Sequence, residues 1–464
     1  MIQTDIAIIG AGPGGYIAAL RARQLGARVV VIERERIGGV CLNWGCIPTK
    51  ALLHSAEALE MARGARRFGV RTGEVSYDWA AVQAHKERVV AQLVGGVSKL
   101  LSRAGAQVLT GEARFVRERT LRVASPAGDE TVEAETIIIA TGSRTLVVPV
   151  PGLDDPGILD STTVLALERL PASLCIIGSG AIGTEFASLL ATFGVQVTLV
   201  EMLPRIAPLM DHSVSDGLAW SLERRGVDIK TGARVTQVER LASGYRTTLQ
   251  TATGAETVET ERVLSAIGRA PNVEHLGLET IGLQPTRKGI QVDARLRTAA
   301  PGVYAIGDVA AEGPMLAHVA THQGIVAVED AMALPARMDY DAVPSCIFSL
   351  PEAASVGLTE EQVRERHGEA LTGVFALVNN GKALAMGETE GFVKVVAEPR
   401  HGAVLGVHIV GPHASDLILQ GVLGLQLELT LDEWTHTIQP HPTLGEALGE
   451  AALLALKRPL AVPS

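Results

Sequence analysis

The sequence predicts an α/β protein with two Rossmann-like domains and an α+β C-terminal domain. The first observation is a glycine-rich turn between an apolar run and a helix of small residues. The second is a repeat of this arrangement further along the 464-residue chain, and the third is a change to alternating strands after about residue 341. A chain of this length, with 47% hydrophobic and 20% charged residues, indicates a folded protein with several cores.

Composition excludes several classes of protein. A net charge of −10 argues against nucleic-acid or anionic-membrane binding, and no apolar run reaches the length of a membrane span. The 4 cysteines are too few for a disulfide scaffold. No further Cys or His stands at zinc spacing near the one close cysteine pair, so we expect no metal. The N-terminus enters a strand at once and has no presequence pattern, so we expect a soluble cytoplasmic protein.

The first Rossmann-like unit begins with a strand at residues 5–9, a glycine turn at 10–15 and a helix at 16–25. A second strand follows at residues 27–32 and ends at an acidic residue, Glu33. The glycines of its turn are Gly10, Gly12, Gly14 and Gly15. Gly10 makes the turn, Gly12 lets the backbone reach a pyrophosphate, and Gly15 allows close packing of helix on strand. Glu33, at the end of the second strand, is placed to hold ribose hydroxyls. The unit therefore predicts a bound dinucleotide.

The second unit repeats this order. Its first strand is expected at residues 173–177, its glycine turn at 178–183 and its helix up to 193, followed by a strand at 196–200 and the acidic residue Glu201. Its turn contains Gly178, Gly180, Ile182 and Gly183. Two such units in one chain predict two nucleotides. Glu201 can accept both ribose hydroxyls of NAD but would repel the 2′-phosphate of NADP, so NAD is expected. Arg205 keeps a phosphate clamp open as the alternative.

A cysteine pair, Cys41 and Cys46, precedes a helix predicted from Pro48 to about Arg63. Cys46 would lie near the N-terminus of that helix, where the helix dipole favours a thiolate. A thiolate there is a nucleophile and an electron donor. From the residues alone, the pair could also be structural or a chance spacing.

The run GGVCLNWGCIPTKALL resembles the redox-disulfide signature of the flavoprotein disulfide reductases, class I of the pyridine nucleotide-disulfide oxidoreductases. It is most similar to that of the dihydrolipoamide dehydrogenases, and the resemblance covers nearly the whole chain. It implies FAD at the first unit and NAD at the second. It also implies that a lipoyl dithiol attacks a Cys41–Cys46 disulfide at Cys41. Cys46 then passes electrons to FAD, and hydride goes on to NAD.

The same resemblance assigns further residues. His441 is implied as the base and Glu446 as its orienting carboxylate, while Lys50 is expected to pair with Glu185. Asp308 is expected to bind the ribityl chain of FAD. Other cofactor positions are Thr141, Gly142, Gly268, Met315, Leu316, Ala317 and His318.

Simpler interpretations remain for some of these positions. Glu185 could be an exposed helix carboxylate, and the His441–Pro442 pair could be an ordinary turn. His318 is expected on the flavin side or in a structural role rather than as a base. Gln439 stands where relatives often carry a second histidine, which puts the fit of the substrate in doubt.

The resemblance also predicts domains and partners. The expected domains are residues 1–148 for FAD, 149–270 for NAD, 271–340 returning to the FAD domain, and 341–464 as an interface domain. The expected assembly is a homodimer in which the base of one subunit reaches the disulfide of the other. The expected partners are the lipoyl and subunit-binding domains of the acyltransferase of a 2-oxo acid dehydrogenase or glycine cleavage complex; the sequence does not say which.

Four other functions compete with this one. A mercuric reductase would carry a second cysteine pair, but no cysteine follows Cys346. A glutathione-type reductase would carry arginines near Glu201 for NADP. A soluble transhydrogenase would need neither the cysteine pair nor His441, and neither would a non-catalytic flavin-binding scaffold.

Overall fold

A computed structural model describes residues 1–125 and 128–461, which form two compact units. Unit 1 contains residues 1–51, 81–146 and 268–340. Unit 2 contains residues 52–80, 147–267 and the chain from Asp341 onward. Residues 462–464, at the end of the predicted interface domain, lie outside the described part. The finer division into four segments stays a prediction.

Unit 1 is built on a parallel sheet, whose strands are β1 (Ile2–Ile9), β2 (Val29–Glu33), β3 (Gln107–Thr110), β6 (Glu130–Ile139) and β16 (Val303–Ala305). Their order is β3-β2-β1-β6-β16, which is the order of a Rossmann sheet. Ile6 and Ile8 of β1 face one hydrophobic cluster, and Ala7 and Ile9 face the other. Both faces are buried, as expected for a parallel sheet covered on two sides. The predicted fold class is confirmed for this unit.

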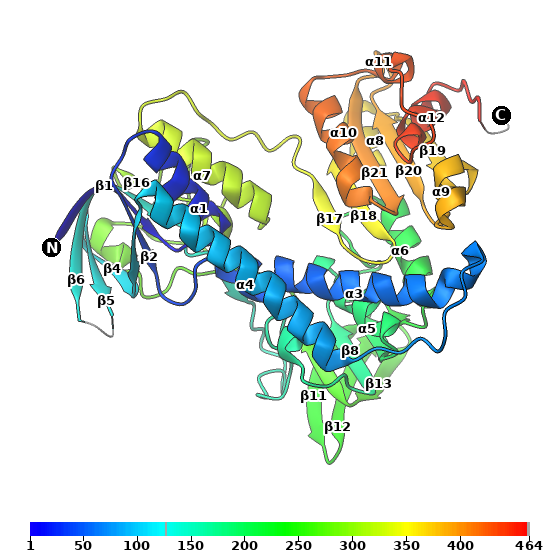
Figure 1. Ribbon diagram of the computed structural model, residues 1–464, viewed down its shortest axis with the longest axis horizontal. Coiled ribbons are helices and arrows are strands. Elements are labelled where there is room, and N and C mark those ends of the chain that lie inside the picture. The colour runs from blue at the N-terminus through cyan, green and yellow to red at the C-terminus, as the bar shows by residue number, and fades with distance from the viewer. Residues whose placement is uncertain (126–127, 462–464) are drawn as a thin grey trace. The chain divides into compact units, whose positions relative to one another are not determined.

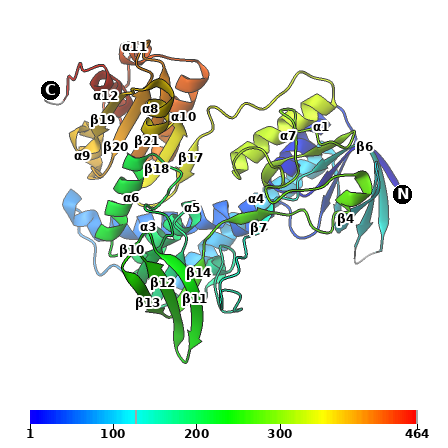
Figure 2. The ribbon, with the colours of Figure 1, turned by 180° about the vertical axis from the view of Figure 1, so that it is seen from behind.

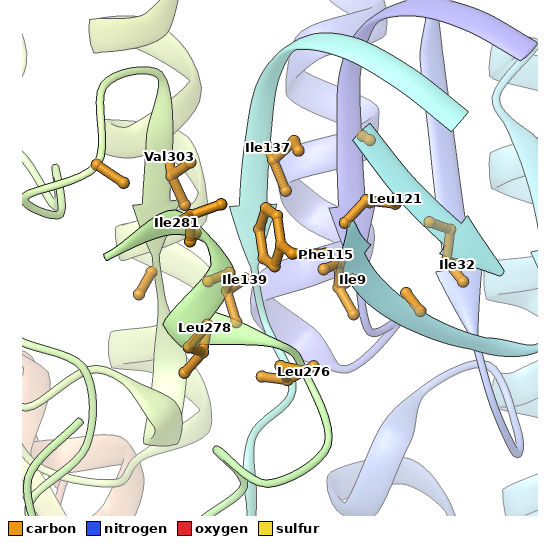
Figure 3. Packing of buried hydrophobic residues seen from close by; sticks show 14 of the residues in the cluster. Ile9, Ile32, Phe115, Leu121, Ile137, Ile139, Leu276, Leu278, Ile281 and Val303 are labelled. Atoms are coloured by element: carbon orange, nitrogen blue, oxygen red, sulfur yellow. The ribbon is translucent and has the colours of Figure 1, made fainter. Parts of the chain in front are cut away.

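Two more strands, β4 (Glu112–Arg117) and β5 (Thr120–Ala124), extend this sheet: β5 pairs antiparallel with the start of β6, and β4 pairs antiparallel with β5. The residues predict a meander over about 107–132 and a buried strand from Thr136. β4, β5 and the start of β6 confirm the meander, but β3 pairs in parallel with β2 and does not belong to it. The predicted buried strand is the second half of β6, which starts earlier, at Glu130. Burial alternates from residue to residue in the first half of β6, because one face of the strand is exposed there. The last residues of the strand are buried on both faces. Phe115 packs in the core between Leu121 and Ile139 (Figure 3).

The helices that begin or lie in unit 1 are α1 (Pro13–Gln24), α2 (Gly39–Trp44), α3 (Cys46–Gly64), α4 (Trp79–Ala104) and α7 (Ala317–Ala331). α3 and α4 each cross the division between the units. α1 and α7 lie side by side (Figure 1). A Cβ on Gly14 would lie 2.9 Å from the carbonyl oxygen of Ala320, and one on Gly324 would lie 2.5 Å from that of Gly14. Glycine at both positions therefore permits this contact.

Unit 2 contains the second parallel sheet, formed by β8 (Ser173–Ile177), β9 (Gln196–Val200), β10 (Asp228–Lys230) and β14 (Arg262–Ser265). The strand order is β10-β9-β8-β14, with α5 (Ala181–Thr192) between β8 and β9 and α6 (His212–Arg224) between β9 and β10. An antiparallel sheet of β11 (Arg234–Leu241), β12 (Gly244–Thr251) and β13 (Gly254–Thr260) is seen from behind in Figure 2. The prediction of a second Rossmann-like sheet is confirmed.

The C-terminal part of unit 2 is an antiparallel sheet with helices, as predicted. Its strands are β17 (Ser345–Ile347), β18 (Glu352–Gly357), β19 (Leu371–Ala376), β20 (Phe392–Ala397) and β21 (Val404–Gly411), in the order β17-β18-β21-β20-β19. Its helices are α8 (Glu360–His367), α9 (Gly381–Met386), α10 (Ala414–Gln426), α11 (Leu431–His436) and α12 (Glu446–Ala455). The sequence did not predict the interior strand β18, because Ala353, Ala354 and Ser355 lack the bulk typical of strands. Small residues suit this strand because α10 packs closely on it.

None of the described helices combines the length and apolarity that a membrane span requires. Within the described residues, no group of three or more His, Cys, Asp or Glu side chains is arranged to hold a metal ion.

Candidate functional site

The first glycine turn leaves the N-terminus of α1 open. Gly12 is the N-cap residue, and no described side chain hydrogen-bonds there. A Cβ on Gly12 would meet only one described atom within 4 Å, the Cα of Gly39 at 4.0 Å. A Cβ on Gly15, by contrast, would lie 2.0 Å from the carbonyl oxygen of Gly10, whose φ is +106°. The uncapped N-terminus of this helix fits the pyrophosphate of FAD.

The second glycine turn has the same form at the start of α5. Gly180 is the N-cap residue, and a Cβ there would meet no described atom within 4 Å. A Cβ on Gly183 would lie 1.9 Å from the carbonyl oxygen of Gly178, whose φ is +98°. Ile182 lies in the first turn of the helix. This turn also fits a dinucleotide pyrophosphate.

The two predicted ribose acids are held alike but not identically. Glu33 Oε2 accepts the N–H of Ala11 at 2.8 Å, and its Oε1 accepts a backbone N–H two residues further on at 2.9 Å. Glu201 has the equivalent backbone bonds at 2.9 and 2.8 Å, and also accepts the hydroxyl of Ser179 at 2.7 Å. A carboxylate has about four acceptor positions, so both acids retain capacity for a ribose hydroxyl. That role stays a prediction for both.

The two cysteines of the predicted redox pair are neighbours. Cys41 lies in α2, and Cys46 is the first residue of α3. A hydrogen bond with Cys46 and burial raise the pKa of the Cys41 thiol, while the charge of Lys50 lowers it and that of Asp308 raises it. The structure therefore brings the pair, Lys50 and Asp308 into one region of unit 1. Two adjacent sulfurs at a helix N-terminus suit thiol–disulfide exchange.

The helix that carries Cys46 begins earlier than predicted. The sequence places the start at Pro48, whereas α3 begins at Cys46. A proline is accepted anywhere in the first turn, so it marks the start of a helix only to within a residue or two. The difference puts Cys46 at the helix end itself.

Two residues near the pair had no predicted role. Burial and then the charges of Cys41 and Cys46 raise the pKa of Tyr16, which places its hydroxyl in their electrostatic range. The side-chain nitrogen of Asn43 donates to the carbonyl oxygens of Ile37 at 3.0 Å and Gly39 at 2.9 Å, which ties the turn before α2 closed. The position of Asn43 between the two cysteines could have indicated from the sequence that this residue belongs to the site. Nothing in the sequence indicated this for Tyr16.

A second group of predicted residues lies where β7 (Ser143–Thr145) pairs with β15 (Arg269–Pro271). Thr141 Oγ1 donates to the carbonyl oxygen of Asn272 at 2.7 Å, and Gly142, with φ +68°, accepts the N–H of Asn272 at 2.9 Å. Asp308 lies in the turn η4 (Gly307–Val309) and accepts a hydrogen bond from the hydroxyl of Ser143. These hydrogen bonds and the β7–β15 pairing bring Thr141, Gly142 and Asp308 into one region of unit 1. Their contact with FAD stays a prediction.

The remaining predicted cofactor positions also lie in unit 1. α7 begins at Ala317 and His318 with Leu316 as the N-cap residue, and no described side chain caps it. Met315, just before the cap, is 38% exposed. Gly268 adopts φ +131°, and its carbonyl oxygen accepts a backbone N–H at 3.0 Å. An open helix N-terminus is compatible with a polar flavin edge. Contact with a cofactor stays a prediction for all of these residues.

Glu185 is not the exposed helix carboxylate that the simpler interpretation proposes. It is 6% exposed on α5, and its Oε1 accepts the backbone N–H of Phe348 at 3.0 Å. That alternative is wrong. Lys50 belongs to unit 1 and Glu185 to unit 2, so their pairing stays a prediction.

His441 and Glu446 form the pair expected of a base and its orienting group. His441 Nδ1 lies 2.9 Å from Glu446 Oε1, and the side chain of His441 is 78% exposed. Burial raises the pKa of Glu446, but hydrogen bonds from the Thr443 N–H and from His441 lower it by more, so the net shift of this pKa is downward. An ionised carboxylate only accepts, so Nδ1 carries the proton and Nε2 is the basic nitrogen. Asn380 Nδ2 also donates to the carbonyl oxygen of Thr443 at 3.0 Å, a support that the sequence did not indicate.

Residues 4–324 match the pyridine nucleotide-disulphide oxidoreductase family, and residues 343–452 match the dimerisation domain of that family. The chain belongs to the pyridine nucleotide-disulphide oxidoreductase family. This membership confirms the predicted family and fold class.

Similar proteins cover nearly the whole chain. A dihydrolipoyl dehydrogenase of Geobacillus stearothermophilus is 40% identical over 99% of this chain and 97% of its own. One from Rhizobium etli is 42% identical over 98% of each chain. Among solved structures, LpdA of Mycobacterium tuberculosis matches 97% of this chain and 99% of its own with a TM-score of 0.89 and 30% identity. The HOCl-induced flavoprotein disulfide reductase RclA of Escherichia coli matches 97% of this chain and 99% of its own with a TM-score of 0.87 and 29% identity.

Proposed function

We propose that this protein is a dihydrolipoyl dehydrogenase, which oxidises the dithiol of a dihydrolipoyl group and transfers the electrons through FAD to NAD. The observation that carries the proposal is the Cys41–Cys46 pair at the start of α3, in the unit whose glycine turn fits FAD. Relatives named dihydrolipoyl dehydrogenase, about 40% identical over nearly the full chain, support it. When bound, FAD supplies the two-electron chemistry that links a dithiol to a nicotinamide.

The residues of this chain carry the thiol chemistry. With the pair oxidised, a lipoyl thiolate attacks Sγ of Cys41, and the Cys41–Cys46 bond breaks to leave Cys46 as a thiolate. The second lipoyl thiolate attacks the first lipoyl sulfur, which closes the lipoyl disulfide and releases Cys41. Two electrons then reside on the cysteines. His441 Nε2 accepts a thiol proton, and Glu446 stabilises the imidazolium.

A substrate comparison tests this function. The purified protein should reduce NAD with dihydrolipoamide far faster than it reduces glutathione disulfide with NADPH. Cys41→Ser should abolish the first reaction. Cys346→Ser, which removes a cysteine of β17 outside the pair, should leave it intact. Faster glutathione reduction by the wild-type protein would instead assign a glutathione-type reductase, and loss of activity in both variants would remove the special role of the pair.

We further propose a homodimer in which His441 acts on the cysteine pair of the partner subunit. The match to the family's dimerisation domain supports this assembly. α10 and its end also present Leu419, Leu423 and Leu427, which are 59%, 49% and 68% exposed. Their spacing of four residues places them on one side of the helix, as expected for a surface that a second copy covers.

Hybrid dimers test the shared site. Cys41→Ser and His441→Ala subunits are each expected to be nearly inactive alone. Refolded together, they form hybrids with one doubly defective site and one intact site, so the mixture should recover about a quarter of wild-type activity under random pairing. If hybrids form without recovery, His441 acts within its own chain.

The proposed setting is a cytoplasmic multienzyme complex. The proposed partners are the lipoyl domain and the subunit-binding domain of an acyltransferase component. The proposed domains are residues 1–148 for FAD, 149–270 for NAD, 271–340 returning to the FAD domain, and 341–464 as the interface. Co-purification with candidate acyltransferases tests which complex the chain serves; if it co-purifies with none of them, the chain is a stand-alone enzyme.

A further inference from the structure

Ser143 joins two charged residues from distant parts of unit 1. Its hydroxyl donates to Oδ2 of Asp308 and accepts from Arg269 Nε at 2.7 Å. Arg269 Nη2 also donates to the carbonyl oxygen of Ser143 at 2.7 Å. The pairing of β7 with β15 sets this geometry, and Ser143 is only 3% exposed.

The direction of these hydrogen bonds follows from the chemistry of the groups. An ionised carboxylate is an acceptor only and a guanidinium is a donor only. The hydroxyl of Ser143 must therefore donate to Asp308 and accept from Arg269. Neither hydrogen bond can reverse its direction, because Asp308 cannot donate and Arg269 cannot accept. Ser143 therefore fixes one orientation of the Asp308 carboxylate and links it to the positive charge of Arg269.

The backbone at Asp308 is held by a separate contact. Gln323 of α7 is 1% exposed, and its Oε1 accepts the N–H of Gly307 at 2.6 Å. Its Nε2 donates to the hydroxyl of Tyr340 at 2.8 Å. Because Gln323 fixes the turn, loss of Ser143 or Arg269 should release the side chain of Asp308 without displacing its backbone.

Asp308 lies close enough to the redox pair to act on it. Its charge raises the pKa of Cys41, after the larger effects of the hydrogen bond with Cys46 and of burial. The Arg269–Ser143–Asp308 chain therefore ends within electrostatic range of Cys41. A change in the net charge at its end should be felt by any redox group bound there.

We propose that Ser143 and Arg269 are positioning residues that orient the Asp308 carboxylate toward FAD and offset its negative charge at the flavin. This inference rests on the proposed function, since it requires FAD in unit 1. A carboxylate that is no longer oriented binds the cofactor less tightly. If the positive charge of Arg269 no longer offsets the negative charge of the carboxylate, that negative charge disfavours the added electrons of reduced flavin. The reduction potential of the flavin is then lower.

Three variants and one control test the proposal. Arg269→Met and Ser143→Ala each break the chain, whereas Arg269→Lys keeps the charge with fewer hydrogen bonds. Arg144→Met is the matched control, because this neighbouring arginine of β7 donates to the Pro271 carbonyl oxygen at 2.7 Å and to Glu274 at 2.6 Å, and within the described chain it forms no side-chain hydrogen bond with Ser143 or Asp308. The measurements are FAD binding to the apoprotein by fluorescence and the flavin potential by equilibration with a reference dye.

FAD should bind Arg269→Met and Ser143→Ala at least tenfold more weakly than it binds the wild type. In Arg269→Met the equilibrium between flavin and dye should lie at least tenfold further toward oxidised flavin, which is about 30 mV for a two-electron couple. Arg269→Lys should restore the potential but only part of the affinity. Arg144→Met should match the wild type in both.

Two results would overturn the proposal: wild-type affinity and potential in Arg269→Met, or equal losses in Arg144→Met. If Arg269→Met does not fold by circular dichroism, FAD binding to Ser143→Ala decides. A wild-type protein that holds no FAD would refute the proposed function itself, which separates the two failures.

Discussion

Nδ1 of His441 lies 2.9 Å from Oε1 of Glu446, and the other oxygen of this carboxylate accepts the N–H of Thr443 at 2.8 Å. The backbone bond fixes the carboxylate, and the carboxylate fixes the ring. Because hydrogen bonds lower the pKa of Glu446, it stays ionised to lower pH than an ordinary glutamate. The ionised carboxylate accepts the Nδ1–H, which leaves Nε2 as the basic nitrogen of the neutral ring.

Glu446→Gln should lower kcat with dihydrolipoamide about 10- to 100-fold, because a neutral amide no longer stabilises the imidazolium. Electron transfer from NADH to an artificial acceptor bypasses the base and should be unchanged. Glu450→Gln, one turn further along α12, is the control, since Oε2 of Glu450 has no hydrogen-bond partner in the described chain. Equal losses in both variants would show that helix charge, not the histidine pair, matters.

The two cysteines should behave differently when each is replaced. Cys41→Ser leaves Cys46 at the N-terminus of α3, where the helix dipole stabilises a thiolate. We expect this variant to show a long-wavelength charge-transfer absorbance with oxidised flavin, and Cys46→Ser to show none. The visible spectra of the two holoproteins decide. Identical spectra would contradict the assigned roles.

Glu201 should decide between the nicotinamides. Wild-type kcat/KM should favour NAD over NADP at least tenfold, or about 1.4 kcal/mol, and Glu201→Ala should reduce this ratio. Glu33→Ala removes the equivalent acid of the first unit and is the matched control; it should weaken FAD retention without changing the ratio. A wild-type preference for NADP would reverse the assignment.

A buried charge cluster in unit 2 makes a prediction about stability. Asp211 is fully buried and accepts from Lys394 Nζ at 2.7 Å. Burial raises its pKa, but His408 and Lys394 lower it by more, so the net shift is downward. Asp211→Asn removes one of the two carboxylates on the buried Lys394, whose other carboxylate is Glu360 at 2.8 Å, and should cost about 1–3 kcal/mol in urea unfolding. The exposed control Asp216→Asn should cost under about 0.5 kcal/mol.

The same shift has a pH consequence. A carboxylate whose folded pKa is depressed contributes stability above its unfolded pKa of about 3.9 and loses it as the pH falls through the folded value. The stability gap between wild type and Asp211→Asn should therefore be constant near neutral pH. It should narrow only below about pH 4. A gap that closes at neutral pH would assign the effect to His408 or another group.

The residues predicted the fold wherever a local pattern carries it. The two glycine turns, their strands and their acids were predictable because spacing along the chain determines the geometry of a βαβ unit. β18 was missed because its small residues serve packing by α10, which no local pattern encodes. The same limit applies to the site. The hydrogen bond from Ser143 to Asp308 joins positions 165 residues apart, and only the folded sheet brings them together.

The most direct test of the central claim is a thiol titration of the FAD-loaded protein under denaturing conditions, with and without prior reduction by NADH. Four cysteines are present, and the claim is that two of them, Cys41 and Cys46, form the reducible pair. Reduction by NADH should expose two additional thiols, and mass spectrometry should place the label on Cys41 and Cys46. An unchanged thiol count, or label on Cys175 or Cys346 instead, would contradict a redox-active Cys41–Cys46 pair.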